Sequence, residues 1–185
     1  MRHNPAWQTS VGHLSPETGG RFDFGSAPVL LKTHEPPHEG PAIYLIRDGR
    51  EVCVSFWHYC NQLGLHRGIT LRQIVEGKTR FGSWSAHVES WQPLQRPQTL
   101  LLQYEQMVSD PPVVVEKLSS FLKIPSASKQ IPSFSQMREI DATFFRAGTN
   151  QTWKQEMSEA ELEIFWQLHG ETMAQYGYVA PTPGG

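Results

Sequence analysis

The stretch from Pro41 to Tyr59 constrains the fold of this chain most strongly, because it joins an apolar run, a charged turn and a helical pattern. Ala42 to Ile46 has the length and composition of a buried parallel strand. The charged turn Arg47 to Arg50 ends this run. From Glu51 onward, four residues recur at helical spacing and share one face: Val52, Ser55, Phe56 and Tyr59. A strand, a turn and a helix are therefore expected in this order.

Arg47 stands at the carboxyl end of this predicted strand. Ligands of open α/β sheets bind beyond the carboxyl ends of the strands, and the helix N-termini there favour anions. Ser55 follows eight residues later, two turns into the predicted helix, and could reach the same anion. The alternative is an Arg47 that pairs with Asp48 or Glu51 on the surface. For an isolated stretch of this kind, that alternative is favoured.

Strands and helices alternate along the rest of the chain, which favours a parallel sheet with helices on both faces. Two further apolar runs predict buried strands, at Ala27–Thr33 and Thr99–Tyr104. Capping and turn residues predict helices at Leu71–Glu76, Gly82–Trp91, Pro111–Leu122 (capped by Asp110, with two prolines in its first turn), Ser133–Glu139 and Ser158 to about Tyr176. The expected organisation is an irregular arm over residues 1–26, an α/β domain over 27–178 and a flexible tail over 179–185.

Composition narrows the class of protein further. The chain has 185 residues, of which 38% are hydrophobic, so one domain with a proper core is expected. A net charge of −2 predicts no nucleic-acid partner, and no apolar run is long enough to predict a membrane span. Cys53 and Cys60 lie about 10 Å apart along the predicted helix, beyond disulfide reach. Reduced cysteines and the absence of a secretory signal predict a cytoplasmic protein.

Three further stretches accompany the first in a recognisable order. LLKTH (30–34) precedes it, LLLQYEQMVSDP (100–111) follows it, and FFRAGTNQTWK (144–154) comes later. In this order the four stretches resemble the cytosolic-type sulfotransferases, which move a sulfonate from 3′-phosphoadenosine 5′-phosphosulfate (PAPS) to an acceptor. The resemblance covers the chain from about Val29 to Tyr178. It implies a three-layer, P-loop-like α/β fold.

The KTH motif carries the catalytic residues that the resemblance implies. Lys32 and His34 are two residues apart, so on a strand they face the same side. In the family, the histidine of this motif is the catalytic base and the lysine contacts the sulfonate. We carry these roles to His34 and Lys32, against the alternative of a histidine that is satisfied by a loop carbonyl.

The nucleotide contacts also follow from the resemblance. Arg47 and Ser55 match the pair that binds the 3′-phosphate, with the same separation. The loop that closes over this phosphate matches Arg146, Ala147 and Gly148, where an arginine offers paired donors and a glycine allows close backbone approach.

Aromatic side chains account for most of the remaining predicted contacts. Tyr104 and Phe134 stand where the family contacts adenine, with ordinary core packing as the alternative for each. Three tryptophans are interpreted as core: Trp84, Trp91 and Trp166. Trp153 and Lys154 match the W-K that follows the phosphate loop of the family, and Glu105 is expected to be structural.

One motif of the family is missing. Relatives begin with a strand and a loop of the PKSGTT or YPRSGNT type, which wraps the 5′-phosphosulfate, and residues 1–28 contain neither. Either the chain is a piece of a longer enzyme, or residues 1–26 fill the gap. Absence of this strand is expected to expose the edges of its neighbours, which favours a partner or a homo-oligomer.

The functional expectation is sulfonate transfer from PAPS to the hydroxyl or amine of a small-molecule acceptor. The alternative is a non-catalytic nucleotide-binding or interaction module derived from a sulfotransferase; an unrelated α/β phosphate-binding protein fits the four ordered motifs poorly. No metal is expected, because His34 and His38 lack further ligands nearby.

Overall fold

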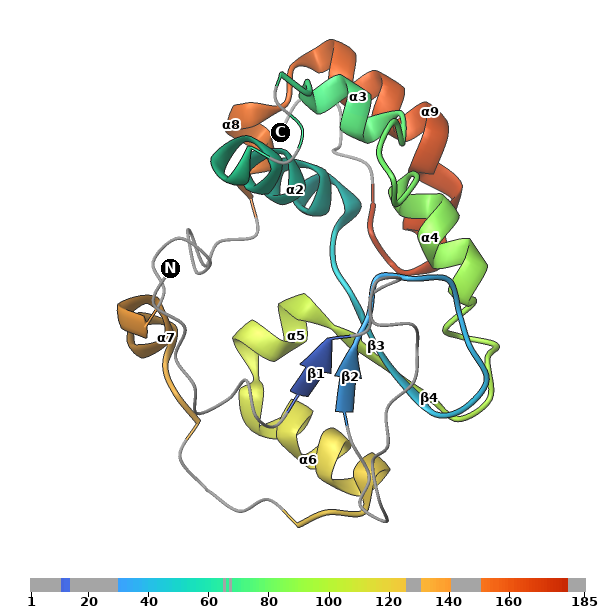
Figure 1. Ribbon diagram of the computed structural model, residues 1–185, viewed down its shortest axis with the longest axis vertical. Coiled ribbons are helices and arrows are strands. Elements are labelled where there is room, and N and C mark those ends of the chain that lie inside the picture. Colours follow the sequence, from blue (N-terminus) through green and yellow to red (C-terminus); the bar gives the residue numbers. More distant parts are fainter. Residues whose placement is uncertain are drawn as a thin grey trace. The chain divides into compact units, whose positions relative to one another are not determined.

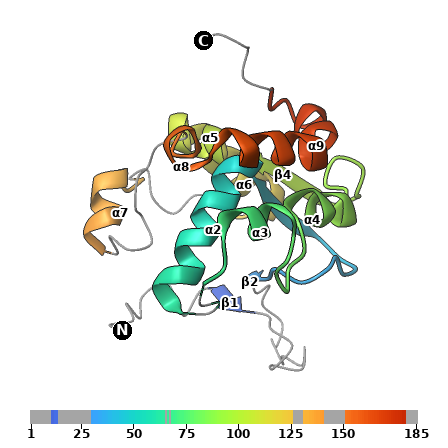
Figure 2. The same cartoon turned by 90° about the horizontal axis from the view of Figure 1, so that it is seen from above.

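The computed structural model describes residues 11–13, 30–64, 66, 68–125, 131–140 and 151–179. The chain divides into two compact units, residues 1–38 and residues 39–185. Figures 1 and 2 show their helices and strands from two directions.

The first unit contains a pair of short parallel strands. β1 (Val11–His13) pairs with β2 (Leu30–Lys32) from one end to the other. The sequence predicted no strand at β1, and β2 lies inside the longer strand predicted at Ala27–Thr33, of which residues 27–29 are outside the described part. That strand was expected to be buried, which is wrong: Leu30 is 43% exposed. β2 has only three residues and belongs to a two-stranded sheet, which is too small to bury it.

The second unit is built around a second parallel pair. β3 (Ala42–Ile46) and β4 (Thr99–Gln103) run in register, with Ala42 opposite Thr99. β3 has the predicted bounds, and β4 ends one residue earlier than predicted. Among the described residues neither strand pairs with a third, and Leu45 is 47% exposed.

The helix after β3 starts earlier than expected. α2 (Gly49–Leu63) is capped by Asp48, whose side chain accepts the Arg50 backbone N–H. Gly49 is required there, because an added Cβ would lie 2.7 Å from the Trp84 ring. Of the four residues expected to share one face, Val52 and Phe56 are half-buried, and Ser55 and Tyr59 are exposed.

Buried residues of α2 follow a stripe that starts inside the charged turn. Arg50, Cys53, Val54 and Cys60 recur at helical spacing and are all buried. The sequence did not predict that Arg50 belongs to this stripe, because it lies in the charged turn. The two cysteines are free thiols, as predicted.

The other helices of the second unit follow their capping signals. Thr70 and Ser158 form the capping boxes that open α3 and α9, and Asp110 caps α6. Two short helices were not predicted, α5 and α8. The bounds are α3 (Leu71–Val75), α4 (Trp84–Trp91), α5 (Tyr104–Ser109), α6 (Pro111–Leu122), α7 (Phe134–Ile140), α8 (Trp153–Glu156) and α9 (Glu159–Gln175).

Helices pack on both faces of the β3–β4 pair. Tyr44 and Ile46 point to one face, where they form a buried cluster with Val88 and Trp91 of α4. Leu102 points to the other face and is buried, and α5 and α6 lie next to β4. The expected α/β fold with a parallel sheet is thus confirmed.

A larger core joins four helices. Its members come from α2, α3, α8 and α9, with Phe165 and Met173 of α9 fully buried. Trp84 and Trp166 pack against it, and Trp91 belongs to the cluster on the sheet, so the three tryptophans lie in the core as predicted. On α9, His169 donates through Nε2 to the Val75 carbonyl oxygen, so its Nδ1 accepts from the Ser85 hydroxyl.

Candidate functional site

The carboxyl end of β3 carries the charged residues of the site. Arg47 lies with its guanidinium carbon 4.3 Å from the centre of the Tyr104 ring. Its Nη2 donates to Glu51 Oε2 at 3.1 Å, one helical turn further on, and the two side chains are 21% and 1% exposed. Two of the predicted nucleotide contacts, Arg47 and Tyr104, are therefore in direct contact with each other. The pair with Glu51 also exists, but its carboxylate is buried and not on the surface.

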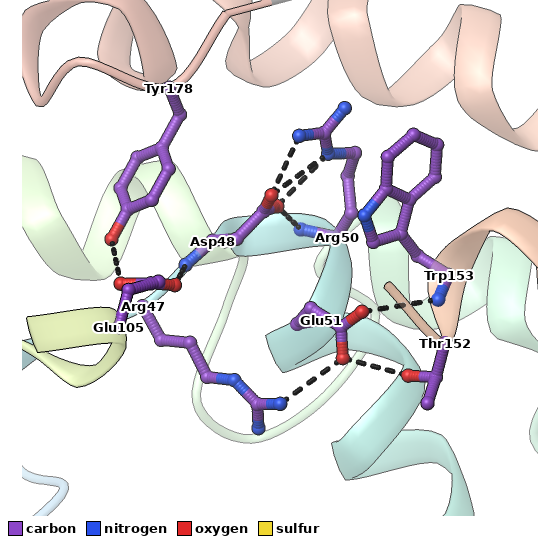
Figure 3. A network of polar contacts seen from close by, with 8 residues as sticks. All are labelled: Arg47, Asp48, Arg50, Glu51, Glu105, Thr152, Trp153 and Tyr178. Carbon is purple, nitrogen blue, oxygen red and sulfur yellow. Dashed lines mark hydrogen bonds and ion pairs between the residues drawn. The ribbon is translucent and has the colours of Figure 1, made fainter. Parts of the chain in front are cut away.

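Glu51 connects this strand end to a distant part of the chain (Figure 3). Its Oε2 also accepts from the Thr152 hydroxyl at 2.7 Å, and its Oε1 accepts from the Trp153 backbone N–H at 3.2 Å. These two donors stand at the start of α8. One buried carboxylate thus fixes the beginning of α8 beside the end of β3.

A second buried ion pair lies next to the first. Asp48 Oδ2 accepts from Arg50 Nη2 at 2.6 Å, and Oδ1 accepts from Nε and from the backbone N–H of the same arginine. The guanidinium carbon of Arg50 lies 3.9 Å from the centre of the Trp153 ring and 5.2 Å from that of Trp166. Burial, with a smaller contribution from Asp48, raises the pKa of Cys53 to about 12.

Glu105 holds the turn from its other side (Figure 3). It accepts the Asp48 backbone N–H at 3.0 Å and the Tyr178 hydroxyl at 2.9 Å. Burial and the nearby Glu105 carboxylate raise the pKa of Tyr178, which therefore stays a hydrogen-bond donor. These contacts agree with the expected structural role of Glu105.

The predicted catalytic residues belong to the first unit. Lys32 ends β2, and both Lys32 and His34 are exposed, with the half-buried Thr33 between them. The Glu35 backbone N–H donates to the Thr33 hydroxyl. Whether the pair meets the residues at the end of β3 stays a prediction.

The remaining predicted contacts are only partly described. Ser55 is exposed on α2, two turns beyond Arg47. Phe134 begins α7, and its side chain is not among those that the structure describes. The predicted phosphate loop lies outside the described residues: Arg146, Ala147 and Gly148.

Sequence reasoning named Glu51 only as an alternative surface partner of Arg47 and did not single out Thr152. Glu51 stands four residues after Arg47, a spacing that pairs side chains on a helix. That spacing was a usable signal for the pair, but nothing in the local sequence shows that the carboxylate is buried or that Thr152 reaches it.

The described part of the chain lacks two features, a cluster of metal ligands and a helix that could span a membrane. No group of three or more His, Cys, Asp or Glu side chains there could hold a metal ion. None of its helices has the length and apolar character that a membrane crossing needs.

Comparison with known proteins identifies the family. Residues 25–177 match the family model described as the sulfotransferase domain. The chain belongs to this family. Among curated relatives, a 3-beta-hydroxysteroid sulfotransferase of Cavia porcellus is 28% identical, over 80% of this chain and 64% of its own length. Sulfotransferase 1A1 of Rattus norvegicus is 28% identical, over 80% of this chain and 63% of its own length.

Solved structures show the same fold. A mouse sulfotransferase, SULT7A1, complexed with PAP, matches 74% of this chain with a TM-score of 0.64 at 24% identity. A retinol dehydratase in complex with androsterone and the inactive cofactor PAP matches 92% of this chain with a TM-score of 0.66 at 19% identity. The present chain spans 59% of each of these two proteins.

Proposed function

We propose that this chain binds PAPS and transfers its sulfonate to the hydroxyl or amine of a small acceptor. The observation that carries the proposal is the pair formed by Arg47 and Tyr104. The Arg47 side chain is 21% exposed, and its guanidinium lies over an aromatic ring at the carboxyl end of a parallel strand. The chain belongs to the sulfotransferase family. Arginine supplies paired donors for a phosphate, and a tyrosine face suits an adenine ring.

The 3′-phosphate subsite of the proposal consists of Arg47, Ser55 and the segment that contains Arg146, Ala147 and Gly148. Support comes from the position of Thr152, which Glu51 binds beside Arg47. Gly148 precedes Thr152 by four residues, and an extended chain of four residues spans at most about 14 Å. The length of the chain therefore allows Gly148 to approach Arg47. Phe134 joins Tyr104 as the proposed adenine contact.

The proposed chemistry assigns one task to each residue of the KTH motif. His34 takes the proton of the acceptor hydroxyl while the acceptor oxygen forms a bond to sulfur. The bond from sulfur to the 5′-phosphate oxygen breaks, and 3′-phosphoadenosine 5′-phosphate (PAP) leaves with the electron pair of that bond. Lys32 balances negative charge on the transferred group.

Known relatives guide the choice of acceptor. One relative is named a 3-beta-hydroxysteroid sulfotransferase, and the retinol dehydratase structures contain androsterone or retinol. These are apolar molecules with a hydroxyl group, and we propose an acceptor of the same class. A cytoplasmic location is part of the proposal, supported by the free thiols of Cys53 and Cys60.

Isothermal titration calorimetry with PAP and with AMP, which lacks the 3′-phosphate, tests the nucleotide site. The wild-type chain should bind PAP more tightly than AMP. Arg47→Lys keeps a positive charge opposite Glu51 but removes the planar fork, and should weaken PAP binding by about 10-fold. Arg72→Lys is the matched control, because Arg72 also pairs with a glutamate four residues later, on α3. Equal binding of PAP and AMP by the wild-type chain would refute the nucleotide assignment.

Transfer of radiolabelled sulfonate from PAPS to a hydroxysteroid or a phenol tests the reaction. His34→Ala should abolish transfer and spare PAP binding, and His38→Ala, in the same unit, should change neither. PAP binding without transfer by the wild-type chain would support the alternative, a nucleotide-binding module derived from a sulfotransferase.

A further inference from the structure

Glu51 contacts both Arg47, the residue predicted to bind the phosphate, and the first residues of α8. We propose that Glu51 is a positioning residue of the 3′-phosphate subsite. Thr152 and Trp153 at the start of α8 hold the Glu51 carboxylate in place, and the carboxylate in turn orients the Arg47 guanidinium for the phosphate. This inference rests on the proposed function and adds to it a residue that itself touches no ligand.

The geometry of the carboxylate supports this role. Oε2 receives the Arg47 Nη2 at 3.1 Å and the Thr152 hydroxyl at 2.7 Å, and Oε1 receives the Trp153 backbone N–H at 3.2 Å. The side chain is 1% exposed, so water does not compete for these three donors. Hydrogen bonds that involve an ionised group are stronger than neutral ones. The three contacts therefore hold the Arg47 guanidinium, the Glu51 carboxylate and the start of α8 together.

Contacts within the protein restrict the rotamers of Arg47 before any ligand binds. An arginine side chain is flexible, and binding a phosphate with it costs rotamer entropy. Here Tyr104 covers one face of the guanidinium, and Glu51 accepts from one of its terminal nitrogens. Both contacts limit the rotamers available to Arg47, and this preorganisation favours tight binding.

The contacts of Glu51 with Thr152 and Trp153 also fix the start of α8. Trp153 is 6% exposed and stacks on Arg50, so its position is determined by the core as well as by Glu51. Glu105 offers a comparison at the same strand end, where it accepts from the Asp48 backbone N–H and from the Tyr178 hydroxyl. Glu105 supports the turn, whereas Glu51 directly contacts Arg47, the residue predicted to bind the phosphate.

The ratio of PAP affinity to AMP affinity separates positioning from general stability. Loss of a plain structural contact should change the affinity for both nucleotides or for neither. Glu51→Gln keeps the shape but removes the charge, and should weaken PAP binding by about 10-fold with AMP binding unchanged. Thr152→Val removes only the hydroxyl and should weaken PAP binding by about 5-fold, while Thr152→Ser should restore it.

Glu76→Gln is the matched control for the change of charge. Glu76 pairs with Arg72 at the same four-residue spacing on α3, with side chains 20% and 61% exposed. This variant should leave the ratio of affinities at the wild-type value. If Glu51→Gln fails to fold, the two Thr152 variants decide the question.

The outcomes distinguish this inference from the proposed function. A wild-type chain that binds PAP no better than AMP refutes the nucleotide assignment itself, and the positioning role with it. A wild-type chain that prefers PAP, together with folded variants of Glu51 or Thr152 that keep the full preference, overturns the positioning role and leaves the function intact.

Discussion

Replacing Asp48 with asparagine should lower the free energy of unfolding by about 3 kcal/mol, because it leaves a buried arginine without its counter-charge. Asp48 and Arg50 are each 7% exposed, and the guanidinium lies against the rings of Trp153 and Trp166. Asparagine keeps an oxygen that can cap α2, so the effect of capping is separated from the effect of charge. The remaining loss is that of a broken buried pair.

Equilibrium unfolding in urea, followed by tryptophan fluorescence, measures this loss. Asp48→Asn combined with Arg50→Met should recover most of the stability, since an apolar residue replaces the buried charge in the same stack. Glu76→Gln, in the exposed pair with Arg72, should leave the unfolding midpoint unchanged. A loss below about 1 kcal/mol for Asp48→Asn, the range of surface pairs, would refute the reasoning.

Two further predictions concern α9. Phe165→Ala should lower the free energy of unfolding by about 3–5 kcal/mol, because the ring is fully buried; Leu168→Ala, which is 51% exposed on the same helix, should change it by less than about 0.5 kcal/mol in the same urea titration. Burial lowers the pKa of His169 below its ordinary value of 6.5, so the stability this residue contributes is present above that pH and is lost as the pH falls. Thermal unfolding between pH 7 and 5, about the range in which an unperturbed histidine titrates, should show this loss, and His169→Gln should reduce it; an identical pH dependence in both proteins would contradict the assignment.

Local signals explain why much of the fold was predictable. β3 is a continuous apolar run, and the helices α3, α6 and α9 begin at Thr70, Asp110 and Ser158, whose side chains cap them. Such signals act within a few residues, so they can be recognised in a single sequence. The short helix α8 begins without a side-chain cap bond and is held by contacts with α2, which no local pattern reveals.

The candidate site was predictable only in part. Arg47 and Tyr104 were named from the resemblance, and the structure brings them into contact. Glu51 was named only as a competing partner of Arg47, and Thr152 was not named at all. Their bond joins residues 101 positions apart in the chain. Burial of charged residues depends on such long-range partners, so the sequence did not predict that Arg50 and Glu51 of α2 are buried.

The two buried ion pairs at the end of β3 have different partners and should therefore have separable effects. Asp48 binds Arg50 within the turn, where the arginine packs into the tryptophans of the core. Glu51 binds Arg47, which is the partly exposed member of the set. Trp153 contacts both pairs, its ring against one and its backbone N–H bonded to the other.

If this division holds, Asp48→Asn should reduce stability and keep the preference for PAP over AMP, and Glu51→Gln should reduce that preference. Equal losses of preference in the two variants would show that Trp153 couples the pairs into a single unit. Buried charges of this kind are retained in some proteins because they fix one arrangement of the chain and not because they add stability. At this strand end, the buried charges fix the position of α8 relative to Arg47, the residue predicted to bind the phosphate.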